Sequence, residues 1–140
     1  MFGEIKPVLI DTDVIINHLR GKKEDTSFLR RVMVEEEFKG FFSVITEIEL
    51  FAAERIDEKQ AKEIGEILEI LYRVELNSMV ARLAGNLLGT FRKSHGLEMP
   101  DAVIAASALY YGMPLATKNT RHYSFISGLL LIPPEAYFLN

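Results

Sequence analysis

Short apolar runs that lack the alternating pattern of a half-exposed strand constrain the fold of this chain more than any other feature. Strands of this kind are buried on both faces, as in parallel sheets covered by helices on both sides. Segments with helical spacing separate the runs, and strands that alternate with helices predict an α/β fold. We expect a three-layer α/β/α sandwich around a central, mostly parallel sheet. The runs expected to form strands are 7–10, 41–45, 114–117 and 129–132, with a shorter one at 72–76.

Helical periodicity and end signals locate the helices between these strands. The pair Lys39-Gly40 is expected to end the first helix, and Gly96 and Gly112 are expected to end two later ones, because glycine is common where a helix stops. Asn77 or Ser78 is expected to cap the helix that Gly96 ends. The expected helices are 26–38, one that begins at Thr46, 57–71, 77–92 and 102–111.

Composition limits the class of protein. With 140 residues, 49% of them hydrophobic, the chain can bury one full core, and we expect a single domain over residues 1–140. The absence of cysteine excludes disulfide scaffolds, thiolate zinc sites and thiol catalysis. A net charge of −4 argues against a generally basic nucleic-acid-binding surface. Residues 1–4 show no signal-peptide pattern, and the most apolar stretch, 102–116, is too short for a bilayer, so we expect a cytoplasmic protein.

Acidic and amide side chains recur where the predicted strands end. In an open parallel sheet, ligands bind outside the carboxyl ends of the strands, so these side chains are expected to converge. Carboxylate and amide oxygens without cysteine or histidine suit Mg²⁺ or Mn²⁺. Carboxylates about 4 Å apart repel by a few kcal/mol, so a fold that clusters three of them is expected to gather a cation. The residues that follow strands are Asp11, Asp13, Glu47, Glu49, Thr117 and Asn119, and Asp101 opens the helix that leads into the later strand.

Each acid also has an explanation that involves no ligand. Asp11 or Asp13 is a favoured residue type for the N-cap of the helix that follows the first strand. Thr46 and Glu49 have the spacing of a capping box. Asp101 follows a proline and adds ordinary negative charge to a first helical turn. From the residues alone, capping and metal binding both remain open.

Four segments, in this order along the chain, resemble the motifs of the PIN-domain ribonucleases. They are 9–16, 43–50, 101–106 and 116–123. The resemblance is closest to the VapC-type toxins of prokaryotic toxin–antitoxin pairs, and it covers nearly the whole chain as one PIN-like domain.

The resemblance implies a metal-dependent ribonuclease. Asp11, Glu49 and Asp101 occupy the acidic positions that bind metal and carry catalysis, with one or two Mg²⁺ or Mn²⁺ ions. Asn119 stands where many members carry a fourth acid, and Asp13 is a weaker candidate ligand that can restore the missing charge. The family also implies a homodimer, a cognate antitoxin and no membrane association.

The same resemblance assigns a set of supporting residues. Hydroxyl side chains are expected to donate hydrogen bonds around the acids, and three basic residues past a strand end are expected to lie near the phosphate path of the RNA. The hydroxyl residues are Thr12, Ser43, Thr46 and Thr117, and the basic residues are Lys118, Arg121 and His122.

Two alternatives remain. The run Asp11-Thr12-Asp13-Val14 after a buried strand also resembles the first motif of the haloacid-dehalogenase-type phosphatases. There Asp11 would be a covalent nucleophile, Asp13 a general acid and Lys118 the phosphate lysine. The second alternative is a non-catalytic RNA-binding or partner-binding module whose acids only cap helices.

Overall fold

The core of the protein is a five-stranded sheet in which every pair of neighbouring strands is parallel. The structure, a computed structural model, describes residues 5–52 and 56–138. The strand order is β3-β2-β1-β4-β5, which confirms the predicted parallel α/β fold. The strands are β1 (Lys6–Ile10), β2 (Phe38–Ser43), β3 (Tyr72–Val74), β4 (Leu115–Ala116) and β5 (Leu131–Ile132).

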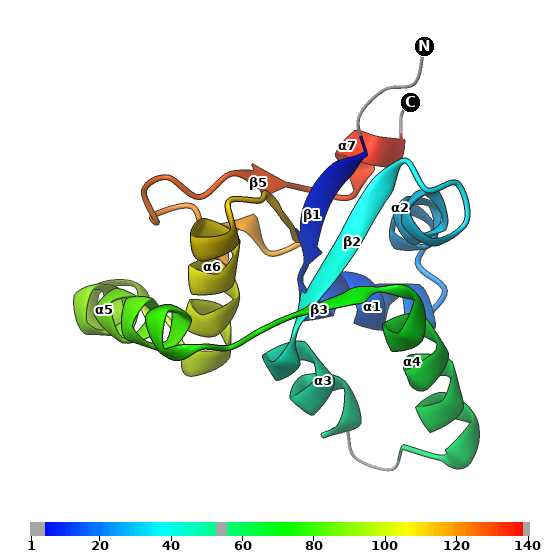
Figure 1. The fold of residues 1–140 in the computed structure, drawn as a ribbon, viewed down its shortest axis with the longest axis horizontal. Helices are drawn as coiled ribbons and strands as arrows, with labels where there is room; N and C mark the ends of the chain where they lie inside the picture. Colours follow the sequence, from blue (N-terminus) through cyan, green and yellow to red (C-terminus); the bar gives the residue numbers. More distant parts are fainter. Residues whose placement is uncertain (1–4, 53–55, 139–140) are drawn as a thin grey trace.

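Helices cover both faces of this sheet. Figure 1 shows α5 and α6 on one side and α2 and α4 on the other. No helix within 5–52 or 56–138 combines the length and the hydropathy that crossing a bilayer requires. The α-helices are α1 (Thr12–Leu19), α2 (Lys23–Met33), α3 (Val44–Phe51), α4 (Glu58–Ile70), α5 (Ser78–His95), α6 (Met99–Tyr111) and α7 (Glu135–Phe138), and a 3-10 helix, η1, covers Thr120–His122.

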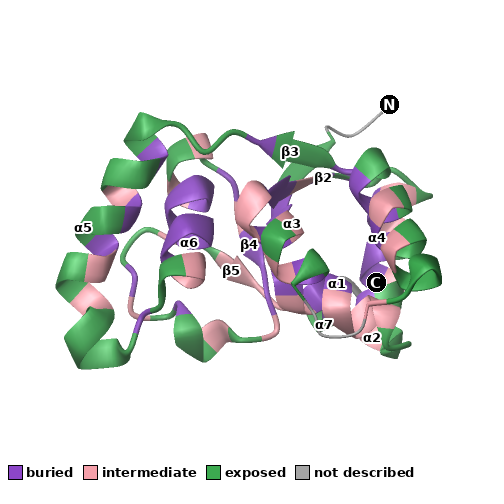
Figure 2. Cartoon of the chain, turned by 90° about the horizontal axis from the view of Figure 1, so that it is seen from below, coloured by how far each residue is buried: buried purple, intermediate pink, exposed green. Residues whose placement is uncertain are grey.

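Strand β1 shows why the apolar runs do not alternate with polar residues. Leu9 packs into the core formed with α5 and α6, whereas Val8 and Ile10 pack into a second core with α1, α2 and α4. All three side chains are fully buried. Figure 2 shows α6 largely buried next to the sheet, with α5 outside it and exposed along its outer face. Both faces of the strand therefore require apolar residues, as its sequence predicts.

The predicted boundary between the first long helix and the second strand is wrong. The helix was expected over 26–38, but α2 ends at Met33, and Phe38 begins β2. Gly40 does not stop a helix; it lies inside β2. A Cβ at this position would lie 2.6 Å from Val32 Cγ1 and 2.7 Å from Leu71 Cδ2. The glycine is needed because side chains from two covering elements pack directly against the strand.

The start of α3 also differs from the prediction. The helix begins at Val44 and not at Thr46, and Ser43 is its N-cap, accepting a hydrogen bond from the Ile45 amide at 3.2 Å. The capping box predicted for Thr46 and Glu49 is therefore wrong. Because Ser43 does the capping, the Thr46 side chain is fully buried inside the first turns, and Glu49 takes part in a different contact, described below.

The remaining helix ends follow their sequence signals. Asp57 forms a capping box with Gln60 at the start of α4, and Asn77 caps α5 by accepting from the Val80 amide. Gly96 and Gly112 end α5 and α6 in the left-handed conformation, with φ of 68° and 66°. These local signals act within a few residues, which is why the sequence alone predicts them correctly.

Candidate active site

The acids meet at the carboxyl ends of β1 and β4. Asp11 directly follows β1 and is the N-cap of α1, and Thr117 directly follows β4. Asp101 comes from the first turn of α6. Figure 1 shows α1 and α3 beyond the ends of β1 and β2 at which the chain leaves each strand. Adjacent parallel strands thus bring distant chain segments to one edge of the sheet.

Asp11 is the most buried of the candidate acids, with 5% of its surface exposed. Its Oδ1 accepts a hydrogen bond from the Thr12 amide at 2.8 Å. Its Oδ2 accepts one from the Thr117 hydroxyl at 2.8 Å and another from the Tyr123 hydroxyl at 3.0 Å. Asp11 therefore caps α1 and at the same time belongs to the polar cluster, so the two explanations open at the level of sequence are compatible.

Tyr123 joins two of the predicted acids and was not among the predicted site residues. Its hydroxyl lies 3.0 Å from Asp11 Oδ2 and 3.2 Å from Asp101 Oδ1, and its side chain is 1% exposed. Burial, followed by the charges of both acids, raises the pKa of Tyr123 far above its usual value, so the hydroxyl keeps its proton. A buried tyrosine hydroxyl needs a polar partner, and the position of this tyrosine in the 116–123 segment was the signal available.

Asp13 was predicted as a weaker candidate ligand, but its side chain is part of the same cluster of hydrogen bonds. Its Oδ2 accepts a hydrogen bond from the Lys118 amide at 2.9 Å. The same atom lies 3.4 Å from the Thr117 hydroxyl, which also donates to Asp11. Its Oδ1 is buried and has no hydrogen-bond partner. An unpartnered buried carboxylate oxygen is costly, so this atom is suited to a cation.

Glu49 reaches the cluster from α3 through a threonine. The Thr12 hydroxyl donates to Glu49 Oε1 at 2.7 Å and lies 3.0 Å from the hydroxyl of the fully buried Thr46. Glu47, two residues earlier, instead forms an ion pair with Arg73. The early start of α3 directs one glutamate toward the residue after Asp11 and the other toward the surface.

The clustered carboxyl groups hold their protons more tightly than they would in water. Burial raises the pKa of Asp11 to about 7, and the charges of Asp13 and Asp101 contribute to this rise, while hydrogen bonds from Thr117 and Tyr123 oppose it. Burial also raises the pKa of Asp13, although a hydrogen bond from the Lys118 amide lowers it in part. Burial raises the pKa of Asp101 in the same way, and the Tyr123 hydrogen bond and the charge of His122 oppose this rise. Desolvation and mutual repulsion both disfavour three negative charges here, and a cation would relieve both.

The chemistry of this cluster fits a hard divalent cation. The available ligand atoms are carboxylate and hydroxyl oxygens, and Asp13 Oδ1 has no partner. Within residues 5–52 and 56–138, no three histidine, cysteine or acidic side chains are grouped so that they could hold a metal ion as they stand. The spacing of the acids in this structure is set by the hydroxyls of Thr117 and Tyr123, which lie between them.

Ser43 and Asn119 take part in the site less directly than the other predicted residues. Ser43 is 2% exposed and caps α3. Asn119 is exposed, its backbone amide donates to Thr117 Oγ1 at 3.0 Å, and its side chain makes no capping bond to η1. The backbone of Asn119 therefore contacts both Thr117 and the Asp13 carboxylate.

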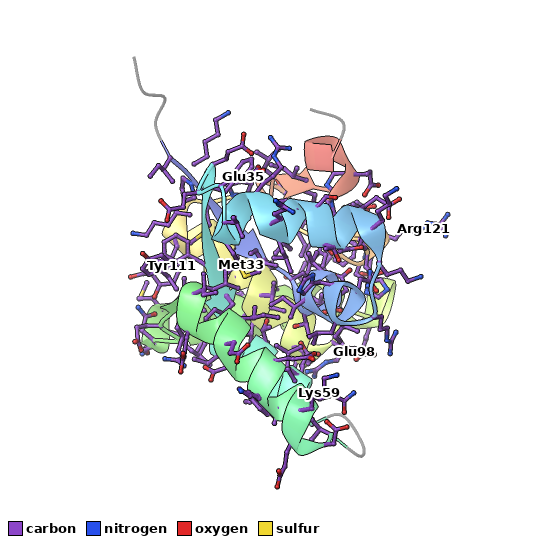
Figure 3. The ribbon with its side chains drawn as sticks, turned by 90° about the vertical axis from the view of Figure 1, so that its right-hand side faces the viewer. Met33, Glu35, Lys59, Glu98, Tyr111 and Arg121 are labelled. Atoms are coloured by element: carbon purple, nitrogen blue, oxygen red, sulfur yellow. The ribbon has the colours of Figure 1, made fainter. Side chains whose placement is uncertain are left out.

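The three predicted basic side chains have different surroundings. Lys118 Nζ lies 3.6 Å from Glu135 on α7. His122 Nδ1 lies 3.6 Å from Asp101 Oδ2, and its neighbour Arg121 is exposed. Figure 3 shows the Arg121 side chain extending away from the ribbon. Of the three, His122 is the one whose side chain contacts an acid of the cluster.

Comparisons with known proteins identify the family of this chain. The family model described as "PIN domain" matches residues 8–126. Ribonuclease VapC10 of Mycobacterium tuberculosis is 31% identical over 130 residues, which cover 92% of this chain and 93% of the relative. Ribonuclease VapC19 of the same species is 31% identical over 123 residues, 86% of this chain and 95% of the relative.

Solved structures show the same fold. DNA-bound VapBC from Salmonella typhimurium matches with a TM-score of 0.78 at 21% identity, covering 94% of this chain and 99% of that one. VapBC2 from Rickettsia felis, bound to a DNA fragment from its promoter, matches with a TM-score of 0.75 at 17% identity, covering 91% of this chain and 98% of that one. With a family match over most of its length and curated relatives that align almost from end to end, this chain belongs to the PIN-domain family, alongside the VapC ribonucleases.

Proposed function

We propose that this protein is a metal-dependent ribonuclease that hydrolyses RNA phosphodiester bonds and acts as the toxin of a toxin–antitoxin pair. The relatives VapC10 and VapC19 are ribonucleases, and the structural neighbours include toxin–antitoxin complexes. One observation carries the proposal for this chain. Three acids are joined by two buried hydroxyls at one edge of the sheet. The Thr117 hydroxyl contacts Asp11 and Asp13, and the Tyr123 hydroxyl contacts Asp11 and Asp101.

The acids of the cluster would hold the metal. In this proposal Asp11, Glu49 and Asp101 bind one or two Mg²⁺ or Mn²⁺ ions, Asp13 adds charge through its unpartnered Oδ1, and Asn119 is a weaker ligand. Such an ion supplies charge neutralisation at the scissile phosphate and lowers the pKa of water.

The protein itself supplies orientation and proton acceptance. Thr117 orients Asp11, and Thr12 orients Glu49, each through a short hydrogen bond. One of the clustered carboxylates would accept the proton of the attacking water. Without metal, burial raises the pKa of the Asp11 carboxyl to about 7, and a bound cation would favour its charged form. Arg121 and His122, next to Asp101, are placed to contact the phosphates of the RNA.

The expected partners follow from the family. We infer a cognate antitoxin, a homodimer and a single PIN-like domain over residues 1–140. Exposed apolar side chains on α3, Ile48 and Phe51, offer surface for a protein partner on the helix that carries Glu49.

The phosphatase alternative receives no support from the site. A covalent nucleophile needs a reachable oxygen, whereas Asp11 is 5% exposed and its Oδ2 already accepts two hydrogen bonds. The match to the PIN family over residues 8–126 also favours the nuclease.

The test is cleavage of single-stranded RNA by purified protein in Mn²⁺, with EDTA and the Asp101→Asn variant beside it. We expect cleavage only by the wild type with metal, and Mn²⁺ is expected to raise its melting temperature because a ligand of the native state stabilises it. Glu47→Gln is the matched control, since Glu47 lies on the same helix as Glu49 but pairs with Arg73, and it should cleave normally. Cleavage that persists in EDTA, or burst release from an aryl phosphate without RNA cleavage, would overturn the proposal.

A further inference from the structure

We propose that the exposed side of the His95 imidazole stacks a nucleobase of single-stranded RNA next to the acid cluster. His95 is the last residue of α5 and is exposed to solvent. The inference rests on the proposed function for the identity of the substrate, but its evidence is a separate set of contacts.

His95 is the outer member of a packed group of three rings. Its imidazole lies nearly parallel to the Phe125 ring, at 21° with 4.1 Å between the centroids. Phe91 contacts both rings, at 5.6 Å from His95 and 4.9 Å from Phe125. The Ser94 hydroxyl lies 2.7 Å from His95 Nδ1 and restrains the rotation of the ring. One side of the imidazole is thus packed while the residue as a whole stays exposed, which is the form of an aromatic platform for an unpaired base.

A pocket connects this platform to the candidate active site. The pocket has a volume of about 190 Å³, and its lining includes His95, Glu98 and Asp101. The described residues that line the pocket do not include Phe125, the ring against which His95 stacks. A base held here would lie beside Asp101, and the phosphate attached to its nucleotide would lie near the cluster.

The pocket offers hydrogen-bond acceptors for a base and basic side chains for its phosphate, because Glu98 and Asp101 line it together with Arg121 and His122. The carboxylates of Glu98 and Asp101 line the pocket and would repel an anion. Glu98 is the N-cap residue of α6, yet its side chain makes no capping hydrogen bond, so its oxygens can accept from the N–H groups of a base. Arg121 lines the same pocket and extends outward, as Figure 3 shows, where it suits a backbone phosphate.

The first experiment uses tryptophan as a reporter. The chain contains no tryptophan, so His95→Trp introduces a single indole at the proposed stacking position. Titration with a single-stranded RNA 12-mer of mixed sequence, in EDTA to prevent metal-dependent cleavage, should quench its fluorescence saturably. Tyr110→Trp is the matched control, because Tyr110 is 45% exposed near the other end of α6, and its fluorescence should not change. An unquenched His95→Trp, or equal quenching of both variants, would overturn the proposal.

The second experiment measures the affinity for the same RNA in EDTA by fluorescence anisotropy. Base–aromatic stacking is worth about 1–3 kcal/mol per base, so His95→Ala should weaken binding by about 5- to 150-fold. His95→Phe keeps a flat ring and should bind within about twofold of the wild type by the same reasoning. Equal affinity of His95→Ala and the wild type would overturn the stacking site.

Failure of this inference and failure of the proposed function are distinguishable. A wild type that cleaves RNA in Mn²⁺ while His95→Ala binds RNA with unchanged affinity overturns the stacking site and supports the ribonuclease. A His95→Trp protein that is quenched by RNA, in a chain that cleaves no RNA with Mn²⁺, supports the stacking site and overturns the ribonuclease.

Discussion

Carboxylates at the two ends of the central sheet differ in burial, in pairing and in the direction of their pKa shift. At the carboxyl end, Asp11 is buried among other acids, and its pKa rises to about 7. At the amino end, Glu37 precedes β2, is exposed and pairs with Arg31, and the hydrogen bond from Arg31 lowers its pKa. The clustered acids at the carboxyl end therefore lower the stability of the folded chain and are suited to bind a cation. The acid at the amino end already has a counter-ion in Arg31.

The largest expected effect is the loss of cleavage when an acid at the carboxyl end is removed. Asp101→Asn should lower RNA cleavage in Mn²⁺ by at least about 100-fold, the scale of losing a group that acts on the reacting atoms. In EDTA the variant should be as stable as the wild type or slightly more stable, because one repelling charge is gone. Clear destabilisation of the variant in thermal melts would indicate that Asp101 mainly supports the fold of α6.

The second effect is a decrease in the stability of the metal-free protein as the pH rises. Asp11 has a pKa of about 7 in the folded protein and an ordinary value of 3.8, so between these values the folded state binds more protons than the unfolded one. In EDTA the free energy of unfolding should therefore fall as the pH rises from about 4 to about 7. Urea denaturation at pH 5 and pH 8 measures the difference, which Asp11→Asn should reduce. A wild type that gains stability over this range would contradict the raised pKa.

A smaller effect is expected at the hydroxyl that joins two acids. Tyr123→Phe leaves Asp11 and Asp101 without a shared donor, and an unmet buried hydrogen bond costs about 1–3 kcal/mol. Calorimetry in EDTA should show a lower melting temperature for Tyr123→Phe. Tyr110→Phe, at an exposed tyrosine of α6, is the control and should melt like the wild type. Unchanged melting of both variants would mean that Tyr123 does not stabilise the cluster.

The smallest effect on cleavage and stability is expected from a substitution at the amino end of the central sheet. Glu37→Gln removes an exposed ion pair with Arg31, and exposed pairs contribute little to stability because solvent screens them. Its RNA cleavage and its melting temperature should both match those of the wild type. A marked loss of either would remove the contrast between the two ends of the sheet.

The sequence predicted the parts of the site that depend on strand ends and missed those that depend on side-chain direction. Asp11 was found because it follows a strand that ends at the common edge, whereas Asp101 was found at the start of a helix and through the resemblance to the PIN-domain family. Thr46 was misread as a cap because it has the spacing of a capping box with Glu49, while Ser43, which lies inside the strand predicted over 41–45, does the capping. Tyr123 was missed because it follows a short 3-10 turn, where no periodicity shows which way a side chain points.

The α/β layering follows from the sequence by itself, because helix caps, helix ends and the burial of strands depend on neighbours within a few residues. The tertiary structure alone decided which acids share a hydroxyl. Thr117 and Asp11 are 106 residues apart in the chain and 2.8 Å apart between their hydrogen-bonding oxygens. It also decided that His95 borders the same pocket as Asp101. Coulomb repulsion, desolvation and hydrogen bonding depend on distance in space, so the raised pKa values and the proposed stacking site appear only after the chain has folded.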